Sequence, residues 1–316
     1  MNLHNRISAV IADLAHPVSA APERPLKDRI HGVINDLSGS DTASAASHFE
    51  RRKPTIAEFQ SVLDRYLAYA CHETLRNLEE ARAGKQPRAA RIILNVELPV
   101  HAAGVSADIV FDLSRFASGL LAALRGVART ALGTATAQCL HEIRAGLAPG
   151  RDDAFELPDP AAIAYLDRRE NLLKDIPNEI HSQIKEELNE GITAGESMAD
   201  LTKRITSTFE DIGKSRAKTI ASTETAAAYG FARHESMVAC GITRKSWLTS
   251  HLPNVRVAHA MAEDDSRNQK CPVDQPFEVG GEKLMYPGDP DGSAENVINC
   301  HCVEIAEADS DPEGRY

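Results

Sequence analysis

Apolar side chains recur at helical spacing along this chain, and this pattern limits its fold more than any other feature of the sequence. Within residues 56–81, the apolar positions Phe59, Leu63, Leu67 and Cys71 fall every four residues. Residues three or four positions apart lie on the same face of an α-helix. The spacing therefore predicts a helix over residues 56–81 with one buried face.

The same periodicity continues towards the C-terminus. It predicts further helices over residues 114–146, 176–188, 198–205 and 216–239. We expect Gly213 to interrupt the pattern, because glycine is a poor helix former, and Ser215 to cap the helix that follows.

Extended segments are few and short. Residues 94–100 alternate apolar with polar or small side chains, and Ile109 and Phe111 form a second extended candidate beyond Gly104. This predicts a β-hairpin, and residues 245–248 predict the start of another strand. The expected fold class is α+β, with a mostly helical N-terminal part followed by a mixed C-terminal domain of helices, short strands and loops.

Changes in composition divide the chain into five expected regions. They are a loosely packed arm (1–55), a helical domain with a hairpin (56–150), a linker (151–160), a C-terminal domain (161–305) and an acidic tail (306–316). The linker is inferred from its acidic residues and prolines. We interpret the basic residues 51–53 and the acidic segment from Glu304 onwards as solvated. The C-terminal domain is expected to fold without residues 1–150.

Charge and hydropathy exclude several classes of protein. The chain has 35 Lys and Arg against 46 Asp and Glu, and this net charge of −11 opposes coating of nucleic acid or of anionic membranes. The longest apolar runs are far shorter than the roughly 20 residues of a membrane helix, and no signal pattern is present at the N-terminus. We therefore expect a soluble protein made in a cytoplasm, with its six scattered cysteines as reduced thiols.

Glu224 shares a helix face with apolar positions, and a buried carboxylate needs a partner. Arg256 and His259 follow shortly after Trp247 and are the cationic candidates. We expect the three to form a structural polar cluster that ties the helix to the loops after Trp247. In the alternative, Glu224, Arg256 and His259 are the acid–base set of a nuclease or nucleotide-transferring enzyme.

Four soft metal ligands occur in the C-terminal part: His259, Cys271, Cys300 and Cys302. Zinc sites usually contain Cys-x2-Cys pairs, which are absent, and Cys-x-Cys is expected to bend the chain too tightly to supply two tetrahedral ligands. We therefore expect no metal and no cofactor. The alternative is a zinc-stabilised binding module that uses these four residues.

Ordered motifs in the C-terminal part resemble a known family. They are the segments 216–224, 245–247, 256–259, 272–277, 284–289 and 299–302. In this order they resemble the phage Mu F-like family of minor head proteins, also described as the phage head morphogenesis family, over about residues 175–305. The residues to which the resemblance gives a structural role are Thr223, Glu224, Trp247, Arg256, His259, Pro287, Gly288, Asp289, Asn299, Cys300 and Cys302.

The resemblance implies a minor capsid protein that acts in phage head morphogenesis. Residues 161–305 would be the Mu F-like domain, and the chain would associate with the portal and enter the procapsid. Implied partners are the portal protein, a scaffold or major capsid protein and, for some members, phage DNA. The implied location is the capsid interior of the virion, after assembly in the host cytoplasm. No enzyme activity is implied, and Ser222 stands where members usually have arginine.

Overall fold

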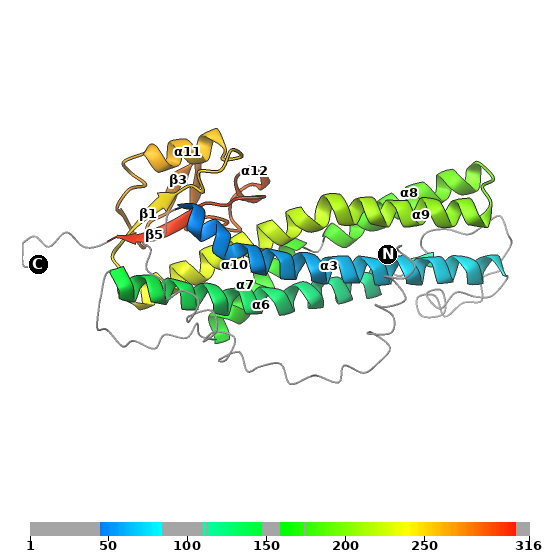
Figure 1. The fold of residues 1–316 in the computed structure, drawn as a ribbon, viewed down its shortest axis with the longest axis horizontal. Helices are drawn as coiled ribbons and strands as arrows, with labels where there is room; N and C mark the ends of the chain where they lie inside the picture. Colours follow the sequence, from blue (N-terminus) through cyan, green and yellow to red (C-terminus); the bar gives the residue numbers. More distant parts are fainter. Residues whose placement is uncertain (1–44, 84–109, 112, 147–158, 174, 308–316) are drawn as a thin grey trace, which may run out of the picture. The chain divides into compact units, whose positions relative to one another are not determined.

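The computed structural model describes residues 45–83, 110–111, 113–146, 159–173 and 175–307 (Figure 1). The contacts between residues divide the chain into two compact units. Unit 1 contains the described residues of 60–125 and 170–218, and unit 2 contains those of 22–59, 126–169 and 219–316.

Two long helices contribute residues to both units: α3 (Ala45–Arg82) and α6 (Leu113–Gly146). They confirm the helices predicted over 56–81 and 114–146. However, α3 begins eleven residues earlier, inside the expected arm. Its first turns are buried through polar side chains, His48, Arg52 and Thr55, so apolar spacing gave no signal there. Arg52 is only 2% exposed, and its interpretation as solvated surface was wrong.

Unit 1 is helical in its described part. α8 (Asp175–Thr193) packs against α9 (Met198–Ile212), which starts at the N-cap Ser197. Phe111 is buried in this unit, and its ring lies 5.0 Å from that of Phe116 and 6.2 Å from that of Phe209. The predicted amphipathic helices over 176–188 and 198–205 are confirmed.

Gly213 does not interrupt the helix. Its backbone is helical, with φ −59° and ψ −48°, and a π-helical turn over Gly213–Ala217 joins α9 to α10 (Lys218–Ala239). Ser215 does not cap α10, because its hydroxyl donates to the Asp211 carbonyl instead. The π-helical turn leads directly from α9 into α10, so α10 does not begin at a separate N-cap.

Unit 2 combines helices with short antiparallel strands. Its three-stranded sheet has the order β2 (Cys271–Pro272), β1 (Arg244–Leu248), β5 (Val303–Glu307). A two-stranded hairpin of β3 (Phe277–Val279) and β4 (Glu282–Leu284) accompanies it. The remaining elements are α7 (Asp159–Leu173), which ends in unit 1, α11 (Val257–Asp264) and α12 (Ala294–Val297).

The core of unit 2 lies between α11, the sheet and the hairpin (Figure 1). Trp247 of β1 is 1% exposed, and its ring meets those of Phe277 and His259 edge-on, with centroids 5.4 and 5.6 Å apart. The strand predicted from residue 245 and the α+β fold class are confirmed.

Parts of the expected regions lie outside the described residues. The hairpin expected over 94–111 lies outside the described residues except for residues 110 and 111, and Val110 has helical backbone. Residues 151–158 of the expected linker also lie outside them, and α7 begins at Asp159. Glu304 is fully buried in β5, so the tail does not begin there. No described helix combines the length and apolarity needed to cross a bilayer.

The two units do not follow the expected domain boundary. Unit 2 takes residues from both sides of segment 151–160, including the start of α3 and the end of α6. Arg51 of α3 donates to Glu142 of α6 at 2.8 Å, and Arg233 of α10 pairs with the same carboxylate. Residues 219–307 therefore share their core with residues from the expected N-terminal regions.

Candidate functional site

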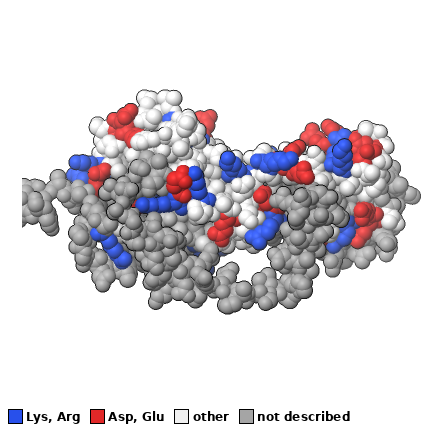
Figure 2. Space-filling model, viewed as in Figure 1, with Lys and Arg blue, Asp and Glu red and all other residues white. Residues whose placement is uncertain are grey.

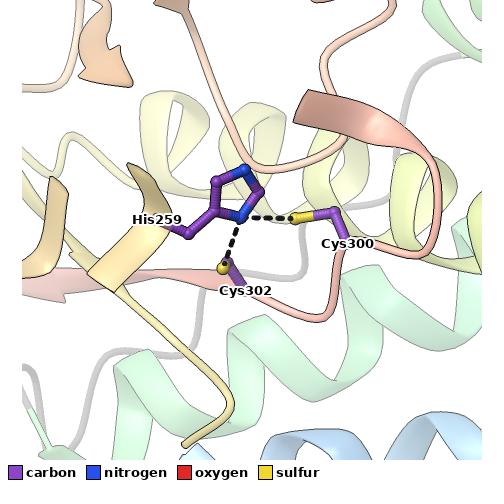
Figure 3. Close-up of side chains that lie close together, drawn as sticks. All are labelled: His259, Cys300 and Cys302. Atoms are coloured by element: carbon purple, nitrogen blue, oxygen red, sulfur yellow. Dashed lines mark hydrogen bonds between the residues drawn. The ribbon is translucent and has the colours of Figure 1, made fainter. Parts of the chain in front are cut away.

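A buried cluster of one histidine and two cysteines lies between α11 and the loop before β5 (Figure 3). His259 is 1% exposed, Cys300 is 1% and Cys302 is 3%. The Nδ1 atom of His259 lies 3.3 Å from the sulfur of Cys302 and 3.8 Å from the sulfur of Cys300. The three potential ligand atoms all lie within 4.8 Å of one another.

Asn296 of α12 orients the histidine ring. Its Oδ1 lies 3.3 Å from His259 Nε2, and its Nδ2 donates to the Val279 carbonyl at 3.4 Å. Because Nδ2 is occupied by a carbonyl, Oδ1 is the atom that faces the ring. Nε2 therefore carries the proton, and Nδ1 turns its lone pair towards the two sulfurs.

The backbone that carries the two cysteines is held from three sides. Asn299 adopts a left-handed conformation with φ 54°, and its N–H donates to Thr223 Oγ1 of α10 at 3.0 Å. The Cys300 N–H donates to the Val297 carbonyl, and Arg52 donates to the Cys302 carbonyl at 3.2 Å. A left-handed non-glycine residue persists only where its surroundings fix it.

The two thiols are coupled to each other. A hydrogen bond between them lowers the pKa of Cys300 and raises that of Cys302, and burial adds to the rise at Cys302. His259 supports the lowered pKa of Cys300. Cys300 is therefore the more acidic of the two thiols.

Cys271 does not join this cluster. Its sulfur lies 3.5 Å from the Pro272 carbonyl, at the start of β2, and it packs in the unit 2 core. The set of four ligands considered from the sequence thus reduces to three. The Cys-x-Cys pair was expected to bend the chain too tightly for two ligands, and the structure places both of its sulfurs near His259 Nδ1.

Glu224 has a different partner from the two that were expected. Arg169 of α7 binds both carboxylate oxygens of Glu224, and both side chains are buried. Arg256 instead donates to the Ile298 carbonyl, and His259 faces the thiols. The structure therefore places the expected cluster of Glu224, Arg256 and His259 in separate interactions.

The Pro-Gly-Asp motif forms a turn that packs on α10. A Cβ atom on Gly230 would lie 2.2 Å from the Pro287 carbonyl oxygen, so the helix and the turn are in direct backbone contact. Gly288 has φ 83°, which favours glycine. The buried carboxylate of Asp289 accepts from the N–H groups of Met285 and Asp291. These contacts hold the turn against α10.

Several residues that contact the site or its motifs could not be identified from sequence patterns. Arg169, Arg52 and Asn296 bind site or motif residues far away in the chain. Lys245 and Glu304 are fully buried, and Lys245 Nζ lies 3.9 Å from Glu304 Oε2. This pair was not predicted, because strand periodicity alone does not distinguish a buried charged side chain from a solvated one. Burial lowers the pKa of Lys245 in spite of Glu304.

A polar groove in unit 1 is a weaker candidate. It lies along α8 and α9 and is lined by Glu187, Glu196, Arg204 and neighbouring polar residues. Arg204 already pairs with Glu187, Glu190 and Glu196. Its guanidinium charge is balanced by side chains of the same unit, so we assign this groove no ligand.

Comparison with known proteins finds a matching family model and a matching protein sequence, but no matching solved structure. Residues 182–305 match the family model described as phage Mu protein F like protein. An uncharacterized protein of Bacillus subtilis (strain 168), YqbB, is 31% identical over 135 residues, which are 41% of this chain and 43% of that protein. The match thus spans less than half the length of that relative. No solved structure matches the chain. The resemblance seen in the sequence motifs is therefore confirmed: residues 182–305 are similar to the phage Mu F-like family.

Proposed function

We propose that this chain is a minor capsid protein of a tailed phage or prophage, which acts in head morphogenesis, associates with the portal and enters the procapsid. The observation that carries the proposal is the match of residues 182–305 to the phage Mu F-like family. Portal association and entry into the procapsid are inferred for this chain from the family resemblance. The experiment below tests both.

The geometry supports a structural role over the enzyme alternative. A general acid or base must reach a substrate proton, within hydrogen-bond distance or through one water molecule. Glu224 is 4% exposed and bound at both oxygens by Arg169, while Arg256 and His259 are engaged elsewhere. These three residues are arranged to hold elements of unit 2 together.

The charge distribution supports protein partners over nonspecific contact with DNA. On the face drawn in Figure 2, basic and acidic side chains of the described residues lie next to one another, without a continuous basic stripe. Together with the net charge of −11, this gives phosphate groups little to bind. The portal protein is therefore the partner that we propose, with a scaffold or major capsid protein as a further contact.

Proteomics of purified particles tests this proposal. In the phage or prophage that encodes the chain, the gene is deleted and the wild-type chain is supplied in trans with an affinity tag. We expect the chain in procapsids and virions at a low ratio to the major capsid protein, portal co-purification with the tag, and fewer normal heads without the chain. An Asp291→Ala variant, changed at an exposed side chain, serves as the matched control and should be incorporated like the wild type. Normal heads without the chain, and particles that lack it, would refute the proposal.

A further inference from the structure

We propose that His259, Cys300 and Cys302 bind one zinc ion, with water as the fourth ligand. The proposal rests on the positions of three ligand atoms and of the side chains that orient them (Figure 3). It does not depend on the proposed role in the phage head.

The spacing of the ligand atoms fits a tetrahedral zinc site. Zinc binds sulfur at about 2.3 Å and imidazole nitrogen at about 2.0 Å, so a tetrahedron has N···S edges of roughly 3.5 Å and S···S edges of roughly 3.8 Å. The N···S distances here are 3.3 and 3.8 Å. The two N···S edges therefore need shifts of only a few tenths of an ångström, and the two sulfurs lie within 4.8 Å of each other.

The ligand set matches the chemistry of zinc. Two sulfurs and one imidazole favour a soft or borderline ion, and a tetrahedral set of nitrogen and sulfur ligands indicates zinc. The cluster comes from His259 on α11 and from two cysteines just before β5, about 40 residues later in the chain. A zinc ion would thus join two segments of unit 2 that lie far apart in the chain.

The surroundings preorganise the ligands as in known metal sites. A metal-binding histidine donates its other ring N–H to a fixed acceptor, which sets the tautomer. Asn296 is this acceptor, and its own amide is oriented by the Val279 carbonyl. A purely apolar core position would need neither the second hydrogen bond nor the strained Asn299.

The charge balance also permits the ion. The buried guanidinium of Arg52 lies close enough to both cysteines for their charges to affect it, and a free divalent cation would be repelled there. Two thiolates cancel the charge of Zn²⁺, so Arg52 would face a neutral site. Within the part of the chain that the structure describes, the cluster contains three ligands, and water completes the set.

Metal analysis of the full-length chain tests the proposal. The protein is purified under reducing conditions, stripped with a chelator, and titrated with Zn²⁺ and separately with Co²⁺. We expect one metal ion per chain, and Co²⁺ should give visible absorption bands of tetrahedral sulfur ligation. Cys300→Ser and Cys302→Ser should abolish stoichiometric uptake. Asn296→Ala should weaken affinity by about 10- to 100-fold, as expected for a residue that orients a ligand.

Cys271→Ser is the matched control, because Cys271 is buried in the same core but lies outside the cluster. It should bind zinc like the wild type. A variant that fails to fold is recognised by the fluorescence of the sole tryptophan, Trp247. A second measurement then uses the wild type alone: zinc should protect Cys300 and Cys302, and not Cys271, from alkylation as read by peptide mass spectrometry.

Two results would overturn the proposal. One is a reduced, folded wild-type chain that binds less than a tenth of an equivalent of either metal. The other is equal loss of zinc by the Cys271→Ser and Cys302→Ser variants, with equal protection of all three thiols.

Discussion

The ion pair between Glu224 and Arg169 should be the most sensitive polar contact of unit 2 to mutation. Arg169 Nε donates to Glu224 Oε2 at 3.0 Å and Nη2 donates to Oε1, so the pair is bidentate. The side chains are only 5% and 8% exposed. We expect Glu224→Leu to lower the free energy of unfolding because it leaves the guanidinium of Arg169 buried without its counter-ion.

The magnitude follows from this burial. Breaking a buried ion pair by removal of one partner costs about 3–5 kcal/mol, whereas replacement of both partners by apolar residues of similar volume is often neutral. Glu224→Leu and Arg169→Met should therefore each cost about 3–5 kcal/mol. The double variant should unfold within about 1 kcal/mol of the wild type, which gives a coupling energy of several kcal/mol.

Urea unfolding at pH 7 measures these values through the fluorescence of Trp247. This side chain is 1% exposed in the core of unit 2, so it reports on the unit that contains the pair. The neighbouring pair of Arg168 and Asp291 is the control, since its side chains are 47% and 72% exposed. Asp291→Ala should cost at most about 1 kcal/mol. A cost below 1 kcal/mol for Glu224→Leu, or a double variant as unstable as the single ones, would refute the reasoning.

Two further predictions use the same unfolding assay. Burial, followed by the charge of Arg233, lowers the pKa of His48 from 6.5 to about 3. As pH falls, His48 is therefore protonated in the unfolded chain before it is protonated in the folded chain, and stability is lost from about pH 6.5 towards pH 3. The free energy of unfolding should be about 2 kcal/mol lower at pH 5 than at pH 7. His48→Gln should lack this part of the pH dependence, and an unchanged slope would contradict the prediction. Gly230→Ala should destabilise unit 2 by about 1–3 kcal/mol, because its Cβ would meet the Pro287 carbonyl at 2.2 Å. Gly126→Ala, which would meet no atom within 4 Å, should instead stabilise by up to about 1 kcal/mol, and equal effects of the two variants would show that the turn does not pack on α10.

The helices of unit 1 were predictable because their burial is apolar and periodic. Leu63 and Leu67 of α3 and Ile180 and Ile184 of α8 are buried at the positions that the four-residue spacing marks. Hydrophobic spacing detects a buried face only when apolar side chains form it. The start of α3 was missed for this reason, since His48, Arg52 and Thr55 form its buried face.

The residue types of the candidate site were visible in the sequence, and their geometry was not. Residue types alone identified His259, Cys300 and Cys302 as soft ligands. Their convergence depends on a left-handed Asn299 and on an acceptor in the four-residue helix α12, neither of which leaves a periodic signal. The true partner of Glu224 lies 55 residues earlier in the chain, and a single sequence carries no information on that pairing.

Each unit is formed by several separate stretches of the chain, and this changes how a docking surface can be located. Removal of residues 1–150 was expected to leave a folded C-terminal domain, whereas unit 2 contains residues from both sides of position 150. Such a truncation would remove Arg52, which binds the Cys302 carbonyl, and Glu142, which neutralises the buried Arg233. A truncated chain that fails to enter procapsids would therefore have lost these buried contacts of unit 2 along with any docking helix. Point substitutions at exposed positions leave these contacts intact, so they are the changes that separate portal binding from folding.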